Sequence, residues 1–162
     1  MRSLLFSLVM TYFIWTTTQA QNVDEIKYIT QDVKTVKELF SLFPNKLVFI
    51  DLWASWCGKC KQELPYSIEF EKELNDSNII FLYASTDNEE EKWKNAIIDN
   101  KLHGYHIRLE KSVKMELKEK FKVNWIPHFI LIDSQGNIIK NGTPLPSQKE
   151  KLLKLFNQNK KE

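Results

Sequence analysis

Two cysteines are the residues of this chain best suited to chemistry. They are the only cysteines among 162 residues, and only Gly58 and Lys59 separate Cys57 from Cys60. A disulfide across so short a loop removes little conformational entropy from the unfolded chain, so it would add little stability. We therefore expect a reactive pair that alternates between dithiol and disulfide, rather than a structural bridge.

The elements around the pair indicate which cysteine reacts first. Residues 47–53 are almost continuously apolar, which is typical of a strand buried on both faces, and residues 57–74 have helical spacing of apolar side chains. Cys57 is then at the start of a helix, where unpaired backbone N–H groups stabilise a thiolate, the attacking form of the side chain. Cys60 lies one turn further on, within disulfide reach, and is predicted to resolve the mixed disulfide.

Two cysteines at this spacing can also be half of a zinc site. The chain has no other cysteine, and its three histidines, His103, His106 and His128, fall in different expected elements without a paired spacing. We therefore predict no bound metal. A copper or zinc chaperone that uses the two cysteines as ligands remains one alternative, and a non-catalytic binding module with a permanent disulfide remains another.

The rest of the chain predicts a single α/β domain in which strands and helices alternate and the last two strands form a hairpin. The hydrophobic and charged fractions, 43% and 27%, are those of an ordinary globular protein. Strands are expected at 26–30, 47–53, 79–85, 105–109, 128–132 and 137–140, and helices at 35–42, 57–74, 89–100, 112–121 and 147–156. The net charge of +2 is spread without a basic stripe, so no nucleic-acid partner is expected.

The first residues resemble a secretory signal. Arg2 precedes an uncharged, mostly apolar stretch over residues 4–15, and small polar residues follow up to Ala20. We expect residues 1–20 to be removed, leaving a domain of residues 21–162 outside the cytoplasm. Because the apolar stretch is shorter than the ~20 residues of a membrane span, an anchor is the alternative.

Residues 49–60, together with Pro65 and the pair Ile126-Pro127, resemble the thioredoxin superfamily. The run from Cys60 to Pro65, the signal segment and residues 89–109 are similar to TlpA/ResA-like exported reductases. The resemblance implies a thioredoxin-like fold, with a central mixed sheet and helices on both faces. It also implies a periplasmic reductase of protein disulfides that needs no dissociable cofactor and receives electrons from a membrane or periplasmic donor. We expect a monomer.

Asp51 and Glu63 are candidate acids beside the cysteines. Asp51 stands in the apolar strand, where burial should raise its pKa and suit it to accept a proton from the resolving thiol, the role that the resemblance assigns to the matching acid. Glu63 lies three residues beyond Cys60, and the matching glutamate of ResA-like proteins lies by the active site. The alternatives are a strand-end Asp51 bonded to local backbone and a solvated Glu63.

Three further residues are predicted to bind substrate. The resemblance implies a cis bond before Pro127 and a backbone at Ile126 that offers hydrogen bonds to an extended substrate strand. A proline that merely starts a strand is the alternative. Trp56 is expected to form apolar surface around the thiols, and Trp53 to belong to the core. Lys59 stands where the family usually has proline, so the motif leaves the redox potential open.

Overall fold

The computed structural model describes residues 25–159, and the expected signal segment lies outside them. Its six strands form one mixed sheet in the order β1-β4-β3-β2-β5-β6. All the expected strands are present, with ends that differ from the prediction by at most two residues. They are β1 (Ile26–Tyr28), β2 (Leu47–Trp53), β3 (Ile79–Ser85), β4 (Gly104–Arg108), β5 (His128–Ile132) and β6 (Ile138–Asn141).

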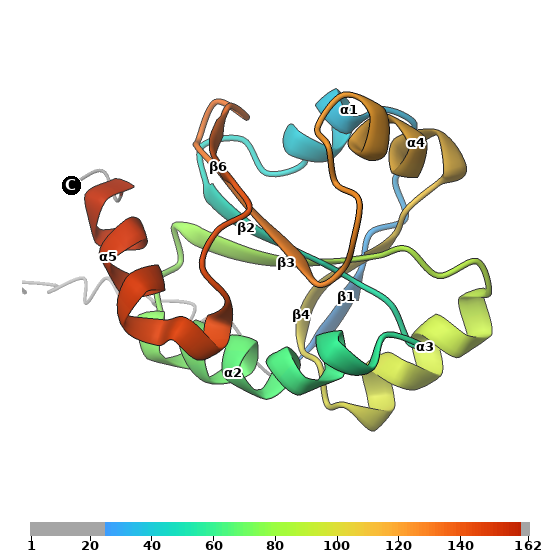
Figure 1. Ribbon diagram of the computed structural model, residues 1–162, viewed down its shortest axis with the longest axis horizontal. Coiled ribbons are helices and arrows are strands. Elements are labelled where there is room, and N and C mark those ends of the chain that lie inside the picture. The colour runs from blue at the N-terminus through green and yellow to red at the C-terminus, as the bar shows by residue number, and fades with distance from the viewer. Residues whose placement is uncertain (1–24, 160–162) are drawn as a thin grey trace, which may run out of the picture.

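Helices cover both faces of the sheet, as the resemblance implies. In Figure 1, α1 (Val36–Phe40) and α4 (Lys111–Glu119) lie on one face. The other face carries α2 (Gly58–Leu74), α3 (Glu90–Asp99) and α5 (Lys149–Asn159), with a short 3₁₀ turn, η1 (Pro146–Gln148), before α5. None of the helices within residues 25–159 combines the length and apolar character that crossing a bilayer requires.

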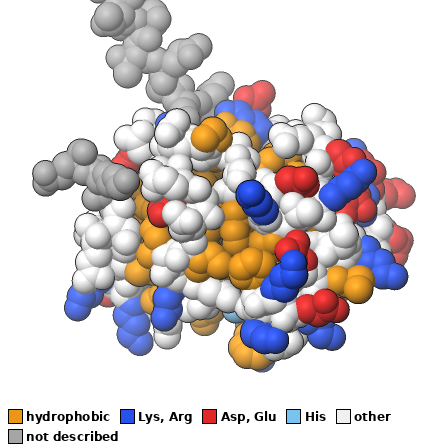
Figure 2. Space-filling view, turned by 90° about the horizontal axis from the view of Figure 1, so that it is seen from above, with side chains coloured by type: hydrophobic (Ala, Val, Ile, Leu, Met, Phe, Trp, Pro, Cys, Tyr) orange, Lys and Arg blue, Asp and Glu red, His pale blue; other side chains and the backbone are white. Residues whose placement is uncertain are grey.

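Alternation along β2 divides the core into two layers. Phe49 and Trp53 belong to the cluster beneath α2, α3 and α5, whereas Ile50 and Leu52 belong to the cluster beneath α1 and α4. Because successive side chains of a strand point to opposite faces, Asp51 faces α2. Figure 2 looks onto the face with α1 and α4 and shows hydrophobic side chains at its centre, bordered by charged ones.

The last helix completes the layer beneath α2. The ring of Phe156 is fully buried and packs against Phe49, Phe70 and Phe81, with ring centroids 5.6, 5.2 and 6.3 Å away. Such aromatic contacts add to the free energy gained by burying the rings. The core on this face therefore combines residues from β2, β3, α2 and α5.

The sheet topology brings three loops together at one end of the central strands. β2 runs parallel to β3 and antiparallel to β5, so the ends of β2 and β3 meet the beginning of β5. At this end Trp53 pairs with Ser85, and Leu52 pairs with His128. The segment before Cys57, the turn after β3 and the residues before β5 consequently lie together.

Candidate active site

Cys57 and Cys60 form a disulfide at the start of α2, with Cα atoms 5.2 Å apart. Cys57 is the N-cap of the helix, and its Sγ atom accepts a hydrogen bond from the backbone N–H of Cys60 at 3.1 Å. A thiolate at Cys57 would keep this bond and face the positive end of the helix dipole. Cys57 is 6% exposed and Cys60 is 1% exposed, so the N-cap sulfur is the more accessible of two shielded ones.

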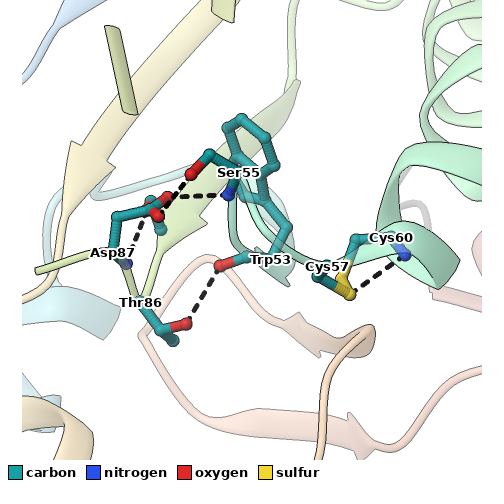
Figure 3. Close-up of a disulfide and its surroundings, with 7 residues drawn as sticks. Trp53, Ser55, Cys57, Cys60, Thr86 and Asp87 are labelled. Carbon is teal, nitrogen blue, oxygen red and sulfur yellow. Dashed lines mark hydrogen bonds between the residues drawn. A yellow bond between two sulfur atoms is a disulfide. The ribbon is translucent and has the colours of Figure 1, made fainter. Parts of the chain in front are cut away.

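A buried carboxylate fastens the segment that leads to Cys57 (Figure 3). Asp87, in the turn after β3, accepts hydrogen bonds from the backbone N–H of Ser55 at 2.8 Å and from the Ser55 hydroxyl at 2.7 Å. The Ser85 hydroxyl donates a third bond at 2.7 Å. Asp87 therefore holds the chain two residues before the reactive cysteine.

The same turn is held by β2 and by α4. Thr86 donates to the carbonyl oxygen of Trp53 through its backbone N–H at 2.9 Å and through its hydroxyl at 3.2 Å. From α4, the ammonium group of Lys114 donates to the carbonyl oxygen of Thr86 at 3.3 Å and to Asn88 Oδ1 at 2.9 Å. The turn thus links α4 to the loop that positions Cys57.

Asp51 is buried against α2 with an incomplete set of hydrogen bonds. It is 3% exposed, its Oδ2 accepts from the Ser67 hydroxyl at 3.3 Å, and its Oδ1 has no partner within residues 25–159. Burial raises the pKa of Asp51 to about 7, the Ser67 hydrogen bond opposes the rise, and the negative charge of Glu63 adds to it. This carboxyl can bind and release a proton near neutral pH.

Glu63 contacts the C-terminal part of the chain. Its carboxylate accepts the backbone N–H of Ser147 at 3.0 Å and the Ser147 hydroxyl at 2.9 Å, so it ties α2 to η1. The charge of Glu63 nevertheless acts on the pKa of Asp51. Its direct part in the chemistry stays a prediction.

Trp56 and Ile126, two of the three predicted substrate-binding residues, line a groove of about 440 Å³, which we call the apolar groove. Pro127, the third, is not part of its lining. Its apolar lining comes from Leu52, Trp56, Leu117, Val123, Trp125 and Ile126. Trp56 is 69% exposed, as expected for surface near the thiols, whereas Trp53 is fully buried in the core. The Ile126-Pro127 peptide bond is cis, as the resemblance implies. Trp125, which is 68% exposed, also lines the groove and has no signal in the local sequence pattern.

The histidines do not join the cysteines. His128 bonds Asn141 Oδ1 through Nε2 at 2.7 Å, and His106 is a buried residue of β4, where burial lowers its pKa to about 4. Among residues 25–159, no three His, Cys, Asp or Glu side chains are grouped so that they could hold a metal ion.

Comparisons with known proteins agree with this geometry. A family model described as thioredoxin-like matches residues 45–138. The chain is 24% identical over 151 residues to the thiol-disulfide oxidoreductase ResA of Bacillus thuringiensis, covering 92% of this chain and 86% of that protein.

Solved structures show the same similarity. The thioredoxin domain of a thiol-disulfide oxidoreductase from Bacteroides vulgatus superposes with a TM-score of 0.59 at 29% identity, covering 71% of this chain and 82% of that one. A thiol:disulfide interchange protein from Bacteroides sp. has a TM-score of 0.64 at 24% identity and covers 83% and 86%. The chain therefore belongs to the thioredoxin-like family and carries the cysteine pair of a thiol-disulfide oxidoreductase.

Proposed function

We propose that this thiol-disulfide oxidoreductase reduces disulfides of protein substrates outside the cytoplasm. The observation that carries the proposal is the Cys57 sulfur at the N-cap of α2, which accepts the Cys60 N–H. The Cys57 thiolate attacks a substrate disulfide, forms a mixed disulfide and releases one substrate thiolate. Cys60 then attacks the Cys57 sulfur, releases the second substrate thiolate and forms the Cys57–Cys60 disulfide.

Asp51 supports the second step as proton acceptor. The Cys60 thiol must lose its proton before its sulfur can attack, and a carboxyl with a pKa of about 7 can take that proton at neutral pH. Burial is the main cause of the raised pKa of Asp51, and the negative charge of Glu63 adds to it. We assign Glu63 this indirect role in place of contact with the thiols.

Substrate binds along the apolar groove and at the residues before β5. The exposed ring of Trp56 and the side chain of Ile126 line the groove. The Ile126 backbone, just before β5, pairs with an extended substrate segment.

The division of labour between the cysteines has a direct test. Cys60→Ser should accumulate a covalent complex with the native partner because the resolving thiol is gone, whereas Cys57→Ser should trap little. Each variant is expressed in the native host, quenched with acid and resolved on non-reducing gels. Equal trapping by both variants would mean that the roles are wrongly assigned, and absence of complexes with either variant would argue against catalysis.

The direction of exchange depends on the redox potential. Members of this superfamily range from about −270 to about −120 mV. We expect a value at the reducing end, measured by equilibration with glutathione and alkylation of Cys57. Regeneration then needs a membrane or periplasmic dithiol donor, and a value near the oxidising end would reverse the proposed direction.

The location follows from the N-terminal segment. Removal of residues 1–20 would release the protein into the periplasm as a monomer. Mass spectrometry of protein from the native host should find Gln21 at the N-terminus. A retained Met1 in the membrane fraction would instead indicate an anchored protein.

A further inference from the structure

The charges around the apolar groove are of one sign. Within residues 25–159, the charged side chains that line it are Lys114 and Lys118, and no carboxylate is among its lining residues. The ammonium group of Lys114 already donates hydrogen bonds to the Thr86 carbonyl oxygen and to Asn88 Oδ1. Lys118 is exposed and has no ion pair in the described part of the chain.

The two acids of α4, Glu116 and Glu119, form no salt bridge with Lys118. Glu116 accepts a salt bridge from Lys120 at 3.0 Å and the backbone N–H of Val36 at 2.8 Å. Lys118 therefore presents an unpaired cation at the border of an apolar surface. An opposite charge brought there by a partner would be attracted, whereas a second cation would face two ammonium groups.

The apolar part of the groove suits a side chain of an extended segment. Trp56 and Trp125 both line the groove and are 69% and 68% exposed, and covering such rings removes apolar area from water. A volume of about 440 Å³ is at the lower end of the range for ligand pockets, roughly 300 to 1,000 Å³. A groove of this size accommodates one or two side chains of an extended substrate segment and is too small for a helix or a hairpin.

We infer that this groove selects protein substrates whose reacting cysteine has a large apolar residue on one side and a carboxylate on the other. The apolar side chain packs in the groove against Trp56 and Trp125, and the carboxylate pairs with Lys118. This inference rests on the proposed function, because it concerns the substrates of the same cysteine pair.

Matched peptides test the inference. Each contains one cysteine joined by a disulfide to the same chromogenic aryl thiol, so attack by the reduced protein releases a coloured thiolate. The flanking pairs are Leu and Glu, Leu and Lys, and Ser and Glu, each made in both orders. At low ionic strength we expect the Leu and Glu peptide to react about fivefold faster than the Leu and Lys peptide, with the ratio falling as salt is added.

Variants on α4 and in the groove identify the residues responsible. Lys118→Glu should invert the preference between the Glu and Lys peptides. Lys111→Glu makes the same charge change on the same helix outside the groove, and it should keep both the basal rate and the preference. Trp125→Ser should reduce the advantage of Leu over Ser.

A small neutral disulfide, bis(2-hydroxyethyl) disulfide, separates this inference from the proposed function. If the wild-type protein fails to reduce it, the proposed function itself fails. If the protein reduces it but treats the three peptides alike, the substrate preference alone is wrong. A preference that survives unchanged in Lys118→Glu would also overturn the inference.

Discussion

Two buried aspartates flank the cysteine pair and have opposite surroundings. Asp87 is 2% exposed and its carboxylate accepts three hydrogen bonds, whereas Asp51 is 3% exposed and accepts one. The two carboxylates are therefore equally buried but differ in the number of hydrogen bonds that they accept. A satisfied buried carboxylate acts as an anchor, while an unsatisfied one binds a proton readily.

Their places in the sheet explain the difference. Asp87 follows the end of β3, where the Ser55 amide is not used by the sheet and two serine hydroxyls are within reach. Asp51 lies inside β2, whose backbone is paired on both sides with β3 and β5. Within residues 25–159, the Ser67 hydroxyl of α2 is the one hydrogen-bond donor to its carboxylate.

The largest expected effect is that of removing the anchor. Asp87→Ala should lower the free energy of unfolding by about 3 to 5 kcal/mol, because the half-buried donors of Ser55 and the buried hydroxyl of Ser85 lose their acceptor. Urea denaturation measures the loss. Asp87→Asn is the control, since its amide can accept from the Ser55 N–H and donate to the Ser55 hydroxyl, and it should cost less. A loss below about 1 kcal/mol in the alanine variant would show that the turn is held without Asp87.

Asp51 should destabilise the protein at high pH. Its pKa is about 7 when folded and 3.8 as a free side chain, so the folded state holds the proton more tightly. The stability that the proton provides is complete below about pH 4 and is lost as the pH rises to about 7. Asp51→Asn should therefore be more stable than wild type by about 2 to 4 kcal/mol at pH 8.

The comparison across pH is the check on this prediction. At pH 4 the two proteins should unfold at nearly the same urea concentration. The raised pKa of Glu71 and the lowered pKa of His106 affect both proteins alike, so they cancel in the difference. A stability difference that does not change between pH 4 and pH 8 would contradict the raised pKa of Asp51.

The resolving step should slow by about tenfold in Asp51→Asn, because the proton acceptor is absent. A preformed mixed disulfide at Cys57 isolates this step in a single turnover. In wild type the rate should rise with an apparent pKa near that of Asp51, and the variant should lack this rise. Identical pH profiles between pH 6 and 9 would remove Asp51 from the mechanism.

The smallest expected effects are shifts in the titration of Asp51. Ser67→Ala removes the hydrogen bond to the carboxylate and should raise the pKa of Asp51 further, whereas Glu63→Gln removes a nearby negative charge and should lower it. NMR of the carboxyl carbon follows both. Shifts in the same direction in the two variants would contradict the causes given for the raised pKa.

The helices and strands could be predicted from the sequence because their apolar residues recur at regular spacing or form continuous runs. The strands β2, β3 and β5 begin and end at the expected residues. Asp51 could be found because a charge interrupts an apolar run. Asp87 could not, because an acid among the polar residues of a turn looks ordinary. Its role depends on Ser55, which is 32 residues away in the chain.

The contacts of Glu63 and the lining of the apolar groove also could not be predicted from local sequence patterns. Glu63 meets Ser147 across 84 residues of chain. Trp125 lies in a loop between α4 and β5 that has no period, so its neighbours depend on tertiary packing. The cis bond before Pro127 was expected only through the family resemblance, because a proline before a strand has no local signal for it.

The burial of Phe156 has a consequence for the synthesis of the chain. The rings of Phe49, Phe70 and Phe81 gain this partner from α5, which follows all the strands of the sheet in the described chain. A nascent chain that ends before α5 leaves these rings with an open side and cannot close its core. The core of this domain is therefore completed only after α5 has been translated.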